Sequence, residues 1–234
     1  MDAVILAGGL GKRLKPFTEV IPKPLLPIGE KSVLEIQITL LKKHGFDRIF
    51  LATNYKSEYI ESFFGDGSRY GIEIFVSKEE TPLGTVGPLL LLQEQLKNEF
   101  LVINGDILTL CDFSGFMRFA KSKAALLTVG VKELTTPFQF GNIFFEGDDV
   151  VEIQEKPLIK TNILAGVYVF SPAVFELIPP GVQYDMDNLI NDMLKQKKII
   201  KKFDIHEYWL DIGRVDDYHQ AQLAYKDHFE AEMD

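Results

Sequence analysis

The sequence is poor in the residues that form disulfides and zinc sites. Its single cysteine, Cys111, cannot form an internal disulfide, which favours a reducing compartment such as the cytoplasm. No histidine lies near Cys111 in the sequence, so we expect this thiol to be packed and inert. The four histidines lack metal-ligand spacing, which argues against a zinc site: His44, His206, His219 and His228.

Long hydrophobic runs and an excess of positive charge are also missing. No apolar run approaches the roughly 18 residues of a membrane-spanning helix, and the N-terminus has no basic-apolar signal segment, so we expect no membrane partner. A formal net charge of -9 argues against nonspecific nucleic-acid binding. The 234 residues are 46% hydrophobic, which is enough for the core of one large α/β domain.

A local reversal of charge marks the stretch 6–25. The apolar segment 2–6 predicts a buried strand, and Gly8, Gly9 and Gly11 then allow the backbone to turn and approach a bound group. Successive N–H groups in such a turn can cradle an anion. Four cations stand there against one acid, which indicates a phosphate-bearing ligand: Lys12, Arg13, Lys15 and Lys23.

This stretch differs from the two common phosphate loops. Arg13 stands where Walker A requires a hydroxyl, and Leu14 fills the last glycine position of the dinucleotide fingerprint. A simple tight turn is the alternative interpretation. The segment 22–24, Pro-Lys-Pro, favours function because two prolines keep it out of a helix and present the ammonium group of Lys23 from a stiff loop.

Taken together, these residues resemble the signature of the sugar-1-phosphate nucleotidyltransferases, also called nucleotide-sugar pyrophosphorylases. The matching pattern is Gly8-Gly9-x-Gly11-x-Arg13-Leu14-x-Pro16-x-Thr18, followed by Pro22-Lys23-Pro24-Leu25. The resemblance implies that the loop wraps a nucleoside triphosphate, that Arg13 contacts the departing pyrophosphate and that Lys23 neutralises phosphate charge. The other nucleotide contacts it implies here are Leu6, Ala7, Gly8, Gly9, Gly11 and Lys12.

A second loop, 78–87, precedes an apolar segment, 89–96, that predicts a helix. The resemblance assigns base recognition to this loop, and its Glu-x-Pro-Leu-Gly-Thr form resembles guanylyltransferases, whereas uridylyl- and thymidylyltransferases usually carry Gln. One carboxylate can accept both N1–H and N2–H of guanine. Glu79 and Glu80 are both candidates, and the resemblance adds Pro82, Gly84 and Thr85.

Two aspartates follow predicted strands and lie beside glycines. Asp106 follows the strand 100–104, and Asp211 lies in the segment 209–213, Trp-Leu-Asp-Ile-Gly. A lone Gly-Asp is common in turns, but the resemblance implies that these two aspartates hold Mg2+.

The segments 140–145 and 150–155 predict a β-hairpin around a polar turn. It ends in Glu-Lys-Pro, which in the resembling family contacts the sugar hydroxyls and the sugar phosphate; a solvent-exposed strand end is the alternative. Leu164 stands where the sugar-binding asparagine is usual, so the identity of the sugar stays open. The implied sugar-phosphate contacts are Gly141, Glu155, Lys156, Asn162 and Gly166.

The alternation of strands and helices predicts an α/β fold with a mainly parallel sheet covered on both faces. The resemblance implies a Rossmann-like three-layer sandwich plus a hairpin-rich sugar-binding portion, without the left-handed β-helix domain of larger relatives. We expect one domain, 1–234, with a nucleotide-binding half (1–110), a sugar-phosphate half (111–225) and a C-terminal tail (226–234).

The function implied is transfer of GMP from GTP to a mannose-, heptose- or glucosamine-type sugar 1-phosphate, with Mg2+ and release of pyrophosphate. Uridylyl, thymidylyl or cytidylyl transfer, a non-catalytic nucleotide-sugar-binding regulatory subunit and a Rossmann-type oxidoreductase are the alternatives. The segment 206–214 resembles the corresponding segment of short bacterial enzymes of surface-polysaccharide pathways. Its oligomeric state is open, with a homodimer among the options.

Overall fold

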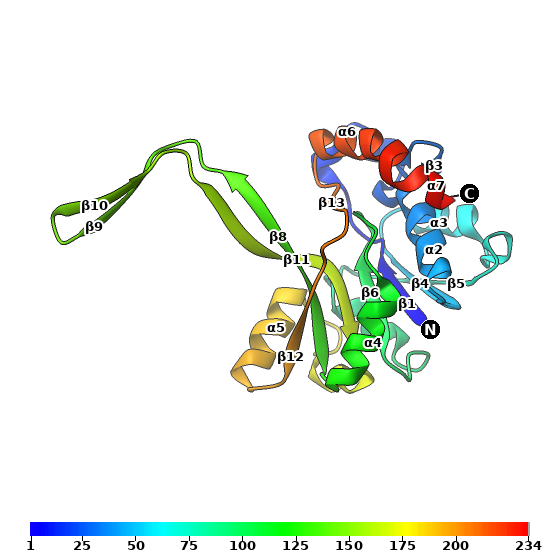
Figure 1. Cartoon of the computed structure of the whole chain (residues 1–234). Coiled ribbons are helices and arrows are strands. Elements are labelled where there is room, and N and C mark those ends of the chain that lie inside the picture. The colour runs from blue at the N-terminus through cyan, green and yellow to red at the C-terminus, as the bar shows by residue number, and fades with distance from the viewer. Residues whose placement is uncertain (234) are drawn as a thin grey trace.

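The computed structural model describes residues 1–233, and its centre is one seven-stranded sheet (Figure 1). In order across the sheet, the strands are β12 (Ile200–Asp204), β8 (Leu127–Pro137), β11 (Leu158–Phe170), β6 (Phe100–Asn104), β1 (Asp2–Leu6), β4 (Arg48–Thr53) and β5 (Glu73–Lys78). β11 runs antiparallel to both neighbours, and every other neighbouring pair is parallel. The predicted mainly parallel sheet is confirmed.

Side chains that alternate along the strands divide the apolar interior into two cores. Ala3 and Ile5 of β1 face one core, whereas Val4 faces the other. The first core is covered by α2 (Val33–Lys43), α3 (Ser57–Phe64), α4 (Phe113–Lys123) and α6 (Val215–Ala224). The second is covered by the 3-10 helices η4 (Gly87–Leu92) and η5 (Pro172–Leu177) and by α5 (Met186–Lys195). The result is the predicted three-layer sandwich.

Short elements complete the chain. They are η1 (Lys12–Leu14), α1 (Phe17–Val20), η2 (Lys23–Leu25), β2 (Pro27–Ile28), β3 (Lys31–Ser32), η3 (Ser68–Tyr70), β7 (Ile107–Thr109), β13 (Trp209–Asp211) and α7 (Glu230–Met233). No helix within residues 1–233 is long and apolar enough to cross a membrane. Cys111 is buried and unpaired, as expected, and burial raises the pKa of its thiol.

Two local predictions need correction. The segment 89–96 is not an α-helix: residues 89–92 belong to the 3-10 helix η4, and residues 93–95 form a turn. Leu89 and Leu92, three residues apart, both point into the core, as three residues per turn require. The expected loop at Lys23 is a single 3-10 turn. After α6 the chain stays helical from Tyr225 to Met233, and Phe229 within this segment is fully buried.

A long arm projects from the sheet (Figure 1). β8 and β11 continue beyond the core as a pair, and the ribbon ends in the separate hairpin β9 (Asn142–Glu146) and β10 (Asp149–Gln154). The hairpin was predicted, but the two strands that carry it, β8 and β11, extend far beyond their buried parts, which are residues 127–130 and 165–170. Their cross-strand pairing runs from Leu164 and Val131 out to Leu158 and Pro137, so the ribbon stays ordered without a core beneath it.

Candidate active site

The site lies at the carboxyl ends of the neighbouring parallel strands β1 and β6, where chains of this topology bind ligands. The glycine-rich loop leaves β1, and the amide of Gly105 after β6 donates to the carbonyl of Leu6 over 2.9 Å. A Cβ at position 105 would lie only 2.8 Å from that carbonyl oxygen, so glycine lets the two strand ends meet. Asp106 follows at once.

β13 brings the second aspartate to the same place. It pairs antiparallel with β7, which sets Asp211 opposite Ile107, and the amide of Ile212 donates to the carbonyl of Asp106 over 3.0 Å. The turn that follows is fixed by Asp217, whose carboxylate accepts from the amides of Gly213 (3.1 Å) and Arg214 (2.7 Å). Two acids 105 positions apart in the sequence therefore lie in one site.

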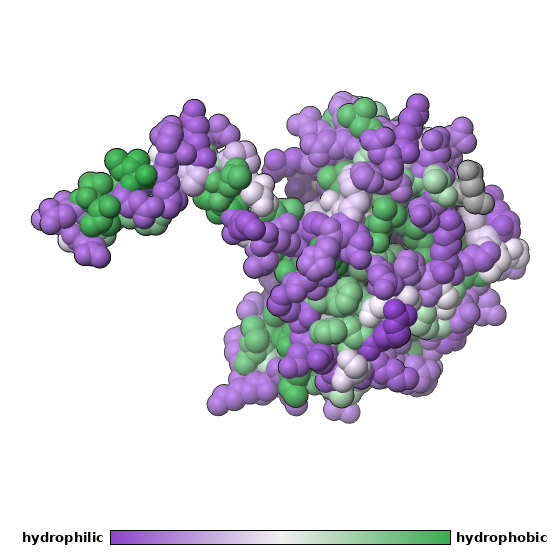
Figure 2. Space-filling view, viewed as in Figure 1, coloured by the Kyte–Doolittle hydropathy of each residue, from purple (hydrophilic) through white to green (hydrophobic). Residues whose placement is uncertain are grey.

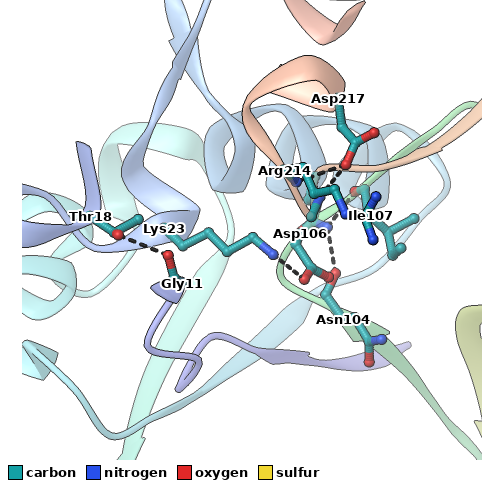
Figure 3. A network of polar contacts seen from close by, with 10 residues as sticks. Gly11, Thr18, Lys23, Asn104, Asp106, Ile107, Arg214 and Asp217 are labelled. Atoms are coloured by element: carbon teal, nitrogen blue, oxygen red, sulfur yellow. Dashed lines mark hydrogen bonds and ion pairs between the residues drawn. The ribbon is translucent and has the colours of Figure 1, made fainter. Parts of the chain in front are cut away.

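Lys23 reaches across from η2 and forms an ion pair with Asp106 (Figure 3). The lysine side chain is 11% exposed and the aspartate 28%, so the pair is only partly screened by water. The glycine loop is packed against the same lysine. Gly11 has φ 58, accepts from the Thr18 hydroxyl over 2.9 Å, and would place a Cβ 2.7 Å from the Thr18 methyl group.

The charged groups around Asp211 act on the pKa of its carboxyl in opposite directions. Its burial, followed by repulsion from Asp106, raises the pKa of the Asp211 carboxyl, and the cations Lys23 and Arg13 oppose that shift. The Arg13 guanidinium lies against Gly213, where a Cβ would be 3.4 Å from one of its nitrogens. A cavity of about 240 Å3 adjoins these residues. It is lined by Gly9, Leu10, Gly11, Lys12, Arg13, Lys23, Asp106 and Gly213.

A larger cleft of about 420 Å3 adjoins this cavity and shares Gly9, Leu10 and Asp106 with it. Its other lining residues come from the strand ends, from the loop after β5 and from the segment before α5. They are Leu6, Gly8, Ala52, Asn54, Glu79, Pro82, Gly84, Thr85, Pro88, Asn104, Gln183 and Asp185. The two spaces together form an elongated site with cations at one end and a glutamate at the other.

Of the two candidate base-contacting acids, the structure brings only Glu79 into the cleft. Glu79 is 8% exposed, and its Oε2 accepts from the amide of Leu83 over 2.7 Å. Burial raises the pKa of the Glu79 carboxyl, while hydrogen bonds from Leu83 and Asn54 lower it. Glu80 points to solvent and lines neither cavity of the described chain.

Several polar residues of the cleft were not predicted from the sequence. Asn54 and Asn104 stand at the carboxyl ends of β4 and β6, and the same rule that selected Asp106 would have found them. Asp185 gave no sequence signal. Its carboxylate accepts from the amide of Thr85 over 2.9 Å, which anchors the loop after β5 to the start of α5.

Gln37 was not predicted from the sequence either, because it lies in the middle of an apolar helix. Its amide nitrogen is buried and donates to the carbonyls of Asn104 (2.9 Å) and Ile107 (2.7 Å). Both carbonyls flank Asp106, so α2 holds this turn from below.

The five predicted sugar-phosphate residues do not lie together: one is beside the cleft, and four are on the arm. Gly166, with φ 69, lies against Asn104, where a Cβ would be 2.8 Å from the amide nitrogen. The other four lie on the arm and, within residues 1–233, line neither of the two cavities: Gly141, Glu155, Lys156 and Asn162. The continuous pairing of β8 with β11 carries them away from the cleft.

The carboxylates of Asp106 and Asp211 are suitable ligands for Mg2+ when a bound substrate supplies phosphate oxygens as further ligands. Mg2+ is usually held by one or two carboxylates together with water and substrate phosphates. Residues 1–233 contain no cluster of three or more histidine, cysteine, aspartate or glutamate side chains that could hold a metal without such help. Two carboxylates beside a cationic cavity fit this pattern.

Comparison with known proteins gives consistent matches. A model of the nucleotidyl transferase family matches residues 2–228. The D-glycero-alpha-D-manno-heptose 1-phosphate guanylyltransferase of Aneurinibacillus thermoaerophilus is 36% identical over 227 residues, covering 95% of this chain and 97% of that protein. The UTP–glucose-1-phosphate uridylyltransferase of Synechocystis sp. is 34% identical over 245 residues, covering 94% of this chain and 62% of that protein.

The chain thus spans less than two thirds of the Synechocystis protein, and the same holds for several mannose-1-phosphate guanylyltransferases, of which it covers 64 to 65%. Among solved structures, HddC from Yersinia pseudotuberculosis complexed with GMP-PN superposes with a TM-score of 0.76 at 28% identity, covering 96% of this chain and 99% of that one.

Proposed function

The chain belongs to the nucleotidyl transferase family, and we propose that it transfers GMP from GTP to a sugar 1-phosphate with release of pyrophosphate. The observation that carries this proposal is the joining of two distant aspartates, Asp106 and Asp211, with Lys23 and Arg13 at the mouth of a cleft of nucleotide size. A binding protein without turnover would need the cleft but not both acids.

In the proposed reaction, an oxygen of the sugar phosphate attacks the α-phosphorus of the triphosphate. The bond from that phosphorus to the bridging oxygen breaks, and pyrophosphate leaves with the electron pair. Both reactants are anions already ionised at neutral pH, so catalysis depends on positioning and charge neutralisation and requires no general base. This agrees with the absence of histidine from the lining of the two cavities in the described chain.

Each charged residue has a proposed part. Arg13 and Lys12, which line the smaller cavity, would bind the leaving pyrophosphate, and Lys23 would offset charge on the triphosphate. Mg2+, when held by Asp106 and Asp211, would neutralise charge on the α-phosphate. The ion pair of Lys23 with Asp106 keeps both groups at the same point before substrate enters.

Glu79 is the proposed base-recognition residue, because it lines the cleft and Glu80 is exposed to solvent. Its Oε2 is bound to the Leu83 amide, and its Oε1 faces the glycine loop, 3.2 Å from where a Cβ on Gly8 would be. A carboxylate oxygen accepts more than one hydrogen bond, so Glu79 can hold its own loop and still accept from guanine N1–H and N2–H.

The sugar substrate and the part of the arm in binding it are also proposed. The proposed sugar is of the mannose or heptose type, because relatives of this chain are named as guanylyltransferases of those sugars. A part in surface-polysaccharide synthesis and a cytoplasmic location are proposed from the sequence resemblance alone. Lys156 would contact the sugar phosphate and Glu155 the sugar hydroxyls, which requires the arm to approach the cleft. Uridylyl transfer stays the second candidate, because the Synechocystis relative is a uridylyltransferase.

The test is a matrix of GTP, UTP, dTTP and CTP against the 1-phosphates of mannose, manno-heptose, glucosamine and glucose. Pyrophosphate release in the presence of MgCl2 is the readout. We expect turnover with GTP to exceed that with the other triphosphates at least about tenfold. Turnover with UTP alone would move the chain to the second candidate. Nucleotide binding without pyrophosphate release from any pair would identify a regulatory subunit.

A further inference from the structure

The arm, residues 132–164, exposes an unusual amount of apolar surface (Figure 2). Neither apolar core contains any buried residue of the arm. Eleven large apolar side chains there are between 38% and 71% exposed: Phe138, Phe140, Ile143, Phe144, Phe145, Val150, Val151, Ile153, Leu158, Ile159 and Leu164. Contiguous apolar surface of this kind marks an interaction site.

The register of the terminal hairpin places its apolar side chains on one face. Phe145 pairs with Val150, and Ile143 pairs with Ile153, so these four side chains share a face. All four are at least 52% exposed. The opposite face carries the pairs Glu146–Asp149 and Asn142–Gln154 and the side chains of Phe144 and Glu152. Such alternation is typical of a ribbon that is covered on one side.

The tip of the arm is also strongly acidic. None of its four acids forms an ion pair with any residue from 1 to 233: Glu146, Asp148, Asp149 and Glu152. A two-stranded hairpin is only marginally stable by itself, and here it carries unbalanced charge and an uncovered apolar face. Both features call for a partner whose surface is cationic and partly apolar.

The same chain offers such a surface. The lysine surface, defined as residues 194–202, runs from the end of α5 along the edge strand β12. Leu194 and Ile199 are 58% and 57% exposed there. Within the described chain Lys197, Lys198 and Lys201 are exposed and have no ion-pair partner.

We infer that the arm of one copy packs on the lysine surface of a second copy of this chain. β12 lies directly beside β8 and runs parallel to it, so the lysine surface lies at the amino end of this strand pair, whereas the arm continues from the carboxyl end of β8 (Figure 1). A two-fold axis perpendicular to these strands reverses the partner, so that each arm faces the lysine surface of the other copy in two equal contacts that close the assembly as a dimer. The acids of each tip then face the lysines of the partner, and the apolar face covers Leu194 and Ile199.

Reciprocal charge reversal tests this inference without any use of enzymatic activity. The tip variant is Asp148→Lys with Asp149→Lys, and the surface variant is Lys197→Glu with Lys198→Glu. Light scattering after size-exclusion chromatography should find wild type as a dimer and each variant as a monomer, with dimerisation weakened at least about tenfold. Mixing the two variants should restore a dimer, because both contacts of the mixed pair are again between opposite charges.

A second pair of variants tests the apolar face. Phe145→Ser should give a monomer, whereas Leu223→Ser, at a side chain that is 77% exposed outside the arm, should leave the dimer intact. Circular dichroism and the melting temperature confirm that every variant is folded. A monomeric wild type at tens of micromolar, or tip and surface variants that stay dimeric, would overturn the inference. Two monomeric variants that stay monomeric when mixed would do the same.

Discussion

Replacing Asp106 by Asn tests the proposed site most directly. The substitution keeps the shape of the side chain but removes the charge that faces Lys23, and it leaves Asp211 as the one carboxylate of the proposed metal pair. Loss of a group that stabilises transition-state charge costs at least about 100-fold in rate, or about 2.7 kcal/mol. We expect pyrophosphate release from GTP and sugar 1-phosphate to fall by that factor or more.

The same substitution has a cost in stability that must be separated from this effect. Breaking a fully buried ion pair costs about 3–5 kcal/mol, but Asp106 is 28% exposed, so about 1–2 kcal/mol is the reasonable figure here. A domain stable by 5 kcal/mol would keep about 3 kcal/mol, and less than about 1% of it would be unfolded. Unfolding therefore cannot account for a 100-fold loss.

Asp2→Asn is the matched control. Asp2 pairs with Arg48 over 2.6 and 2.9 Å at the opposite end of β1, and its side chain is 12% exposed. This variant should lose a similar amount of stability in urea unfolding yet keep turnover within about twofold of wild type. Turnover of Asp106→Asn within tenfold of wild type at saturating MgCl2, or an equal loss of activity in Asp2→Asn, would refute the proposed role of Asp106.

Three further predictions concern the cleft and the chain end. Glu79→Gln should lower turnover with GTP about tenfold, and Glu80→Gln should leave it unchanged in the pyrophosphate assay; equal effects would reject the assignment. Burial raises the pKa of Glu79, so the folded protein binds the carboxyl proton more tightly than the unfolded chain does. Glu79→Gln should therefore raise the melting temperature at pH 7, and this gain should vanish near pH 4. A pH series of thermal melts would check both results. Gly29→Ala should lower the free energy of unfolding by about 1–3 kcal/mol, because Gly29 has φ 58 and a Cβ there would overlap the ring of Tyr225. An unchanged midpoint in urea unfolding would contradict this.

Local sequence patterns were enough for most of the scaffold. The capping box of Ser32 and Glu35 fixes the start of α2 in the sequence itself, because both of its hydrogen bonds span only three residues. The strands β1 and β6 were predicted with the bounds they have, since each is a continuous apolar run between turn residues. The 3-10 form of η4 was missed because helix type depends on which leucines find the core.

The site shows the same division. The sequence by itself determined which residues could bind phosphate and metal, because glycines, prolines and charges act through local backbone geometry and chemistry. Only the tertiary structure decided that Glu79 rather than Glu80 faces the cleft, that Asp185 anchors its loop from 100 positions away, and that Lys156 lies out on the arm. These outcomes depend on burial and on strand pairing between distant segments, which no local pattern encodes.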